Sequence, residues 1–277
     1  MNGAGVVRMP MGTRLTLVES DMRPVLAAAG FRGYEDFVRR EHHDVVGGSG
    51  TTRTRRIRLG PGRDCEDYYL KAYEYRGSRW RHRWRTDKGA VEARNYRLLR
   101  ERCGILVPDV VAFGSRRRGW RLLDAFILTR GVPAETTLDV LFQTRWPSAA
   151  CSSRDPQRTW LLREVSGIVA RMHGAGFFHV DLQWRNLLVS DDASTSRSVF
   201  VLDSPRGGLR RWTAHRAHGR IRDLSSLYKE ARSRLTPAEQ LRWLLWYAGE
   251  RRLTDELRLV IHTILQDRAI KDRPECR

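Results

Sequence analysis

The sequence predicts an α+β fold in two parts, a small β-rich part followed by a mostly helical part. Side chains alternate with the period of a β-strand in the first half of the chain, as in DYYLKAYEY at residues 67–75. Apolar residues recur at helical spacing in the second half, as in RTWLLREVSGIVARMHG at residues 158–174. A chain of 277 residues with 41% hydrophobic content can bury a core in each part. We therefore expect an N-terminal extension over residues 1–44, a β-rich part over 45–131 and a helical part over 132–277.

The first features in chain order are a short helix and a glycine-rich turn. The N-terminal extension shows no regular pattern apart from a short helix near YEDFVRREHH at residues 34–43. Gly48, Ser49 and Gly50 then precede the basic strand RTRRIRL, in the position where a hairpin covers the phosphates of a nucleotide. The turn lacks the G-x-G-x-x-G spacing of phosphate-binding loops, so an ordinary turn and a nucleotide-covering turn are equally favoured.

A strand and a helix follow this turn, and each carries one candidate residue. The strand at residues 67–75 contains Lys71, one of only four lysines among the 51 basic residues. The helix in GAVEARNYRLLRERCG stops before Gly104 and has Glu92 in its first turn, 21 residues after Lys71. A carboxylate there can simply stabilise the helix dipole. We favour pairing of Glu92 with Lys71, with Glu101 as the weaker substitute.

The other regular elements are a hairpin and a helical C-terminal region. VVAFGSRRRGWRLLDAFILTRGV predicts a hairpin with its turn at RRRG. Its second strand leads into a hinge near residues 128–131, whose backbone groups would hold an adenine ring. Two amphipathic helices are expected between residues 236 and 266, with their apolar residues in the core rather than in a cofactor site.

The segment HVDLQWRN at residues 179–186 is the most informative part of the chain. It reads H-x-D-x-x-x-x-N, and the β-hairpin that follows it ends at Asp203, 22 residues after Asp181. Phosphoryl transfer from a nucleotide needs one carboxylate to orient and deprotonate the acceptor hydroxyl. It also needs a second carboxylate and an amide oxygen to hold Mg²⁺ on the phosphates. Asp181 supplies the first group, and Asp203 and Asn186 supply the metal ligands, so the sequence predicts a kinase that uses ATP and Mg²⁺.

Four other residues gain roles from this motif. Lys71 lies on a strand 110 residues before Asp181, where a kinase places the lysine that binds the α- and β-phosphates. Glu92 would hold that lysine in place. His179 either orients the catalytic loop through hydrogen bonds or is a buried structural histidine. Asp223, in RIRDLSSLY, is expected to begin a helix, where it either caps that helix and braces the catalytic loop or is a simple N-cap.

Six short strings occur along the chain in a specific order: YYLKAY, E-x-R-N-Y-x-x-L, GILVPDVVAFG, HVDLQWRN, FVLD and RIRDLSSLY. They resemble the lipopolysaccharide core kinase family, the heptose and Kdo kinases of Gram-negative bacteria, from about Val45 to Tyr247. The resemblance implies a bilobal protein-kinase-like fold, ATP and Mg²⁺ as cofactors, and phosphorylation of a heptose or Kdo hydroxyl of the lipopolysaccharide inner core. It implies the roles already derived for five residues: Lys71, Glu92, Asp181, Asn186 and Asp203.

The motif departs from that of regulated protein kinases. Ser204 and Pro205 follow Asp203 in place of Phe-Gly, and neither an Ala-Pro-Glu motif nor a long activation segment is apparent. Gln183 stands two residues after Asp181, where kinases acting on Ser or Thr usually carry lysine. In having glutamine there, the chain resembles the kinases that act on small molecules, which include the aminoglycoside phosphotransferases and the sugar kinases of the lipopolysaccharide core. We expect Gln183 at the nucleotide site.

Three alternative functions share parts of this pattern. An aminoglycoside phosphotransferase would use the same loop, but a chain with a net charge of +19 should repel its cationic substrate. A protein kinase would need a peptide-binding surface and an activation segment. A non-enzymatic basic protein on a kinase fold would ordinarily have lost one of the site residues, and none is lost. We therefore prefer the sugar kinase.

The net charge of +19 favours anionic partners, which are phosphorylated glycolipid, anionic membrane or nucleic acid. The segment EYRGSRWRHRWRTDKG interleaves arginine with Trp80, His82 and Trp84, which suits a membrane interface and also single-stranded nucleic acid. The catalytic residues need an acceptor and the resemblance implies an anionic one, so we expect an anionic glycolipid substrate and peripheral contact with an anionic membrane. No nucleic-acid-binding fold signature appears, so no nucleic acid is expected. Arginines cluster in four places, at residues 53–58, 76–85, 116–118 and 206–222.

Nothing in the sequence indicates export or a membrane span. The N-terminal segment has no apolar core, and no apolar run approaches the ~18 residues that a transmembrane helix needs. Cys65, Cys103, Cys151 and Cys276 lack C-x-x-C spacing, so neither a zinc site nor a disulfide framework is indicated. We expect a cytoplasmic protein, peripheral on the inner face of the cytoplasmic membrane of a Gram-negative bacterium. The sugar hydroxyl and the oligomeric state are not predicted.

Overall fold

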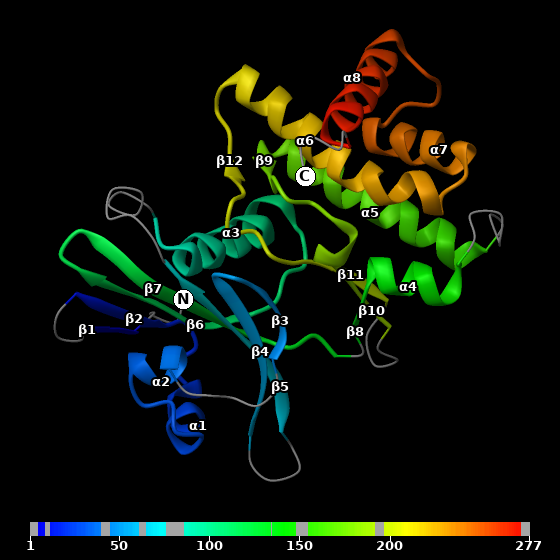
Figure 1. Cartoon of the computed structure of the whole chain (residues 1–277). Helices are drawn as coiled ribbons and strands as arrows, with labels where there is room; N and C mark the ends of the chain where they lie inside the picture. The colour runs from blue at the N-terminus through cyan, green and yellow to red at the C-terminus, as the bar shows by residue number, and fades with distance from the viewer. Residues whose placement is uncertain are drawn as a thin grey trace. The chain divides into compact units, whose positions relative to one another are not determined.

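Strands dominate the first part of the chain and helices the second, so the predicted α+β class is confirmed. The computed structural model describes residues 5–8, 12–39, 45–60, 65–75, 86–133, 135–147, 155–191 and 197–272. The chain folds as two units, Met1–Arg97 with Pro108–Val132, and Leu98–Val107 with Pro133–Arg277. The first unit contains a large sheet, and the second contains most of the helices (Figure 1).

The first unit is built on a seven-stranded antiparallel sheet with the strand order β1-β2-β6-β7-β5-β4-β3 (Figure 1). The strands are β1 (Gly5–Arg8), β2 (Thr13–Leu17), β3 (Val45–Ser49), β4 (Thr52–Leu59), β5 (Glu66–Glu74), β6 (Val110–Arg118) and β7 (Arg121–Arg130). β5 is an inner strand between β4 and β7, and Lys71 lies opposite Thr54 and Ile127. Pairing on both sides fixes the backbone of this lysine.

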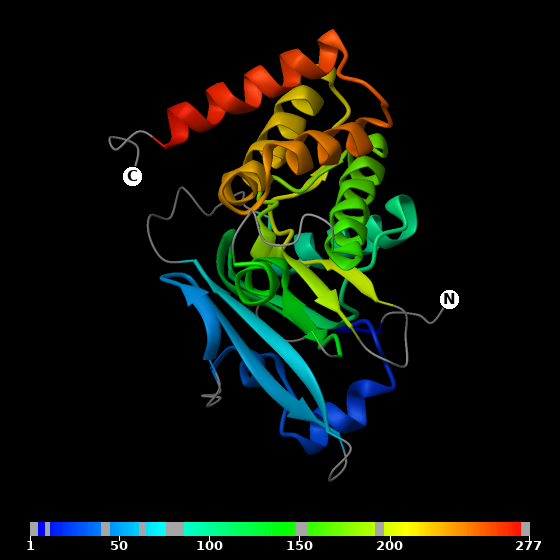
Figure 2. The same ribbon diagram turned by 90° about the vertical axis from the view of Figure 1, so that its right-hand side faces the viewer.

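The region expected as an irregular N-terminal extension takes part in this unit. β2 pairs with β6, and the helices α1 (Met22–Ala28) and α2 (Tyr34–Arg39) follow it. The helix expected near residues 34–43 is α2, which contacts β2, β5 and β7 and so lies across one face of the sheet (Figure 2). Phe37 of α2 stacks on Phe126 of β7 with ring centroids 4.4 Å apart. The five residues of β2 are too few to give a clear strand period in the sequence.

The described part of the second unit contains five complete α-helices, the end of α3 (Lys88–Cys103) and two small sheets. The helices are α4 (Leu138–Arg145), α5 (Pro156–Gly174), α6 (Thr213–Arg234), α7 (Pro237–Ala248) and α8 (Asp255–Lys271). α5 packs on α7 and α6 packs on α8, and α7 and α8 are the two helices expected at the C-terminal end. The sheets have the orders β11-β10-β8 and β12-β9. Their strands are β8 (Glu135–Thr137), β9 (Phe177–Phe178), β10 (Leu187–Ser190), β11 (Ser198–Val201) and β12 (Gly208–Leu209).

Local capping signals determine where the helices of the second unit begin. The Asp155 side chain accepts a hydrogen bond from the amide of Gln157 at the start of α5. Thr236 and Glu239 form a reciprocal capping box at the start of α7. Glu239 also forms a buried ion pair with Arg158 of α5, with 2.7 Å between Nε and Oε1. The same carboxylate therefore begins one helix and holds it to another.

Candidate active site

An ion pair between Lys71 and Glu92 lies in the first unit, with 3.6 Å between Nζ and Oε1. Glu92 belongs to α3 (Lys88–Cys103), and its side chain is only 2% exposed. Its carboxylate accepts hydrogen bonds from the hydroxyls of Tyr73 and Tyr96, the latter at 3.0 Å. A buried carboxylate needs such partners because its desolvation is costly. Glu101, the weaker alternative, is exposed near the other end of α3.

The spacing of these residues explains why they meet. Lys71 and Tyr73 are two apart on β5 and therefore point to the same face of the sheet. Glu92 and Tyr96 are four apart on α3 and therefore share one side of the helix. The Lys71 ammonium also lies 5.5 Å from the centroid of the Tyr73 ring. The tyrosines thus hold the lysine and the carboxylate together.

The glycine-rich turn connects β3 and β4 of the sheet. Gly48 lies opposite Arg53, and Ser49 lies opposite Thr52 in this hairpin. A Cβ atom on Gly48 would lie 2.4 Å from the carbonyl oxygen of Thr52, so the hairpin itself requires glycine there. A Cβ on Gly50 would meet nothing within 4 Å. Contact of these residues with a nucleotide stays a prediction.

The loop that carries Asp181 is fixed by two consecutive residues of α6. The amides of His179 and Val180 donate hydrogen bonds to the Asp223 carboxylate, at 2.8 and 2.6 Å. The Arg222 guanidinium donates from Nε to the carbonyl oxygen of Val180 at 2.9 Å. Val180 has φ of 71°, a left-handed conformation that is strained for a β-branched residue. Hydrogen bonds on both sides of Val180 hold this strain next to the candidate base.

Asp223 holds the loop from within a helix, so the expectation that it caps a helix start is wrong. α6 begins ten residues earlier, at Thr213. Its first part, TAHRAHGRIR, is basic and contains Gly219, so the sequence there carries no helical apolar stripe. The glycine is required because a Cβ atom would lie 2.6 Å from the Phe178 ring. Close packing of α6 on β9 therefore explains why the pattern is hidden.

His179 connects the loop of Asp181 to the position of Asp203. Its side chain is 0% exposed, and Nε2 lies 2.7 Å from the carbonyl oxygen of Leu202. A carbonyl only accepts, so Nε2 carries the proton and donates it. The amide of Leu202 in turn donates to the carbonyl of Asn186 at 2.8 Å. Asp203 follows with φ of 54°, a second residue held in the left-handed region.

Two amides surround Asp181 within the same loop. The Asn186 side chain donates from Nδ2 to the backbone carbonyl of Asp181 at 2.8 Å, which directs its amide oxygen elsewhere. The Gln183 side chain donates to Oδ1 of Asp181 at 2.6 Å. In the described part of the chain, Oδ2 of Asp181 accepts no hydrogen bond. The structure thus brings Gln183 to the candidate base, and a contact of Gln183 with nucleotide stays a prediction.

Sequence reasoning missed a buried layer beneath this loop. His173 of α5 lies with Nε2 3.2 Å from the Asp223 carboxylate and Nδ1 2.9 Å from the Tyr247 hydroxyl of α7. His173 comes four residues after Val169 in the apolar stripe of α5, so it occupies a core position. The sequence could have indicated this layer, because His173 is a polar residue at a position of the helix that otherwise carries apolar core residues.

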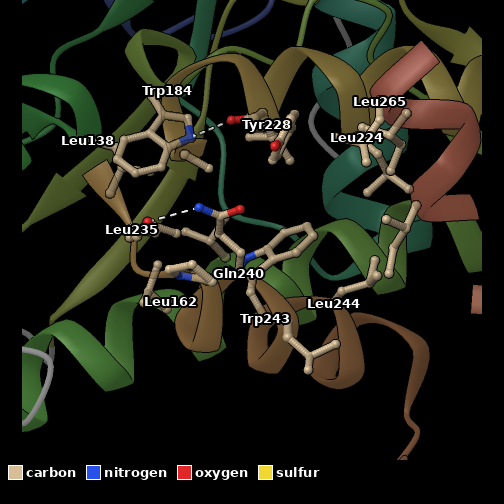
Figure 3. A pocket seen from close by; sticks show the side chains of 17 residues that line it. Leu138, Leu162, Trp184, Leu224, Tyr228, Leu235, Gln240, Trp243, Leu244 and Leu265 are labelled. Atoms are coloured by element: carbon tan, nitrogen blue, oxygen red, sulfur yellow. Dashed lines mark hydrogen bonds between the residues drawn. The ribbon is translucent and has the colours of Figure 1, made fainter. Parts of the chain in front are cut away.

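An apolar cavity of about 290 Å³ lies in the second unit beside Trp184. Trp184 is the first residue of the 3₁₀ turn η1 (Trp184–Asn186) and directly follows Gln183. Figure 3 shows side chains of several helices around it, and leucine is the commonest residue of the lining. The Trp184 indole donates from Nε1 to the carbonyl of Leu227 at 3.1 Å, and Gln240 donates to the carbonyl of Leu235 at 2.8 Å (Figure 3). Two of the polar side chains at the wall are thus partnered within the protein, and most of the lining is apolar.

The tryptophan- and arginine-rich segment at residues 76–85, which includes Trp80, His82 and Trp84, lies outside the described residues. Cys151 and Cys276 lie outside them as well. Cys65 and Cys103 are free thiols.

Comparison with known proteins gives two matches and one negative result. A sequence profile of the lipopolysaccharide kinase (Kdo/WaaP) family matches residues 37–247. Among solved structures, the chain is similar to WaaP in complex with acyl carrier protein, with a TM-score of 0.67 and 23% sequence identity. The alignment covers 94% of this chain and 100% of that one, so the two share a fold. No curated protein sequence matches the chain.

Proposed function

The chain belongs to the lipopolysaccharide kinase (Kdo/WaaP) family and is a sugar kinase of the lipopolysaccharide core, and we propose that it transfers the γ-phosphate of ATP to a heptose or Kdo hydroxyl. The observation that carries this proposal is the loop from His179 to Asn186. Its candidate base and its candidate metal ligand are held by hydrogen bonds within the loop, and the loop is tied to the position of Asp203.

The proposed mechanism assigns each step to a side chain. Asp181 orients the acceptor hydroxyl and accepts its proton at Oδ2, while Gln183 holds Oδ1. Lys71, held by Glu92, binds the α- and β-phosphates of the nucleotide. His179 is a positioning residue, because its ring is buried and holds the backbone before Asp203.

The residues present fit a magnesium ion. Asp203 offers a carboxylate, and Asn186 offers an amide oxygen whose nitrogen is already engaged. Hard oxygen ligands of this kind, few in number and completed by phosphates and water, are what Mg²⁺ prefers. When bound, Mg²⁺ would neutralise charge on the transferred phosphate.

The proposed acceptor and location follow from charge. A net charge of +19 attracts a phosphorylated glycolipid and an anionic membrane surface. None of the described helices is long and apolar enough to cross a bilayer. We place the enzyme on the cytoplasmic side of the inner membrane of a Gram-negative bacterium, in peripheral contact with it.

A second proposed partner is an acyl carrier protein. The similar solved structure is a complex with one, and this chain has an apolar cavity of about 290 Å³ that would suit an acyl chain. An acylated carrier should raise the midpoint of thermal unfolding more than the same carrier without its acyl group. Ala231→Phe, which fills part of the cavity, should remove the difference between the two carriers. Equal shifts with both carriers on the unchanged protein would contradict a role for the cavity.

The test of the kinase is transfer of labelled γ-phosphate from ATP with Mg²⁺ to inner-core lipopolysaccharide that lacks phosphate. Asp181→Asn and Asp203→Ala should each lower kcat by about 10²–10⁴-fold, because each removes a group that acts on the reacting atoms. Both variants should unfold at the temperature of the unchanged protein. Full activity in either variant would refute the assignment. Aminoglycosides and peptides serve as competing acceptors, and transfer to either would favour the corresponding alternative.

A further inference from the structure

The segment between Asp203 and Asp223 is strongly basic. Its 19 residues contain six arginines, two histidines and one tryptophan, but no acidic residue. β12 and the first part of α6 lie in this segment (Figure 1). We define the Trp212 surface as six of its exposed residues: Leu209, Arg210, Arg211, Trp212, His215 and Arg216.

The six residues of this surface are all exposed. Trp212 is 75% exposed and Leu209 is 40% exposed. Arg210, Arg211 and Arg216 make no ion pair with any carboxylate in the described part of the chain. The other end of the segment differs, because Arg220 pairs with Glu256 and Arg222 binds the carbonyl of Val180. Within this segment, Arg220 and Arg222 bind other parts of the protein, whereas the arginines of the Trp212 surface form no ion pair among the described residues.

The backbone of the Trp212 surface is fixed at both ends to the catalytic loop. β12 pairs with β9, so that Gly208 lies opposite Phe178, the residue before His179. The amide of Arg210 donates to the carbonyl of Gly176 at 2.8 Å. At the other end, Arg222 and Asp223 hold the backbone of His179 and Val180. The segment that carries Trp212 is therefore connected through hydrogen bonds to the residues just before Asp181.

The start of α6 also lacks the features that stabilise helix termini. Trp212 is the N-cap residue and makes no side-chain capping bond, and the first turn has no acidic residue. α7 and α8 instead begin with capping threonines and acidic first turns. Positive side chains near a helix N-terminus are unfavourable, so the arginines here do not stabilise the start of α6.

We propose that the Trp212 surface docks the enzyme on an anionic lipid bilayer. An exposed indole beside guanidinium groups is an interfacial combination, with the ring at headgroup depth and arginines on lipid phosphates. Leu209 adds an apolar contact to the same surface. The proposal extends the proposed function, since a glycolipid acceptor lies in such a bilayer, but the docking itself requires neither ATP nor acceptor.

The test is sedimentation of the purified chain with vesicles of phosphatidylcholine alone or mixed with phosphatidylglycerol. Binding should need the anionic lipid and weaken with salt. Each arginine near an anionic surface contributes about fivefold to partitioning, so the double variant Arg210→Glu, Arg211→Glu should lose about 25-fold or more. Trp212→Ala should lose several-fold. The matched control is Trp120→Ala in the β6–β7 turn, because Trp120 is 67% exposed and also lies among arginines.

Several results would overturn the docking proposal. These are undiminished binding by the Arg210/Arg211 variant, an equal loss in the Trp120 variant, and equal binding to neutral vesicles. Displacement from vesicles by single-stranded RNA at matched phosphate concentration would favour nucleic acid as the partner instead. The docking proposal and the kinase proposal can fail separately. Wild-type protein that binds vesicles through Trp212 but transfers no phosphate would support the docking surface and refute the proposed kinase activity.

Discussion

The two groups of site residues, one in each unit, are held in different ways. Lys71 and Glu92 are positioned by side chains, with two tyrosine hydroxyls on the carboxylate. The loop of Asp181 is positioned through its backbone, which donates hydrogen bonds to Asp223 and accepts one from Arg222, both in α6. The side chains around Lys71 act locally, so a substitution of Glu92 should change the affinity for the nucleotide. Asp223 belongs to the core of the second unit, so its substitution should change both the free energy of unfolding and the rate of transfer.

Arg158 and Glu239 form a buried ion pair outside the candidate site. Breaking it should lower the free energy of unfolding more than any other change considered below. Burial raises the pKa of Glu239, but the hydrogen bonds and charge of Arg158 outweigh it, so the pKa lies below its usual value of 4.5. Glu239→Gln should lower the free energy of unfolding by about 3–5 kcal/mol at neutral pH. A lowered folded-state pKa contributes stability above the unfolded value, and that contribution is lost as the pH falls through the folded value. The difference between the two proteins should therefore shrink below pH 4.5 in denaturant titrations, and a constant difference would contradict the ion pair.

Removing the support of the catalytic loop should have the next largest effect. Asp223→Ala leaves the amides of His179 and Val180 and the ring of His173 without their acceptor, which should cost about 3 kcal/mol of unfolding free energy. The rate of transfer should fall as well, although Asp223 does not touch the substrate. Chemical unfolding and kcat measured on the same preparation check this. Normal kcat with lowered stability would show that the loop keeps its shape without Asp223.

Weakening the side-chain support should affect the nucleotide step instead. Glu92→Gln keeps the shape and the tyrosine contacts but removes the charge beside Lys71. The value of kcat/KM for ATP should fall by about tenfold, the equivalent of one charged contact. Glu101→Gln on the same helix is the matched control and should change nothing, because its side chain is exposed. An equal loss in both variants would remove the special role of Glu92.

The smallest expected effect is on the strained residue itself. Val180→Gly should relieve the left-handed backbone, and the gain should nearly cancel the extra freedom of the unfolded chain. The unfolding free energy should therefore change by no more than about 1 kcal/mol. Val189→Gly, in the buried strand β10, is the comparison and should cost more. A large loss in the Val180 variant would mean that the conformation is not strained.

Features with a local signature were predictable from the sequence. The spacing of Asp181, Asn186 and Asp203 identifies the candidate site without a structure, because the chemistry needs these groups in a short stretch. The approach of Glu92 to Lys71 was also predictable, since each residue lies on a regular element with a clear period.

Features that depend on distant contacts were not predictable. Asp223 meets the loop across 44 residues, and the basic sequence around it hides the true start of α6. β2 is too short to show a strand period, and its place in the sheet comes from pairing with β6. The exposure of Trp212 could not be predicted either, because tryptophan is buried in most proteins and only the packing of the chain shows that this one is not.

The anchoring of His179 and Val180 on Asp223 has a consequence for dynamics. A loop held to the middle of a core helix cannot open alone, since opening requires the helix to separate from β9. These two loop amides should therefore exchange their hydrogens as slowly as those of the helical core. Heat or denaturant should remove the activity and the helical signal of the second unit in a single step.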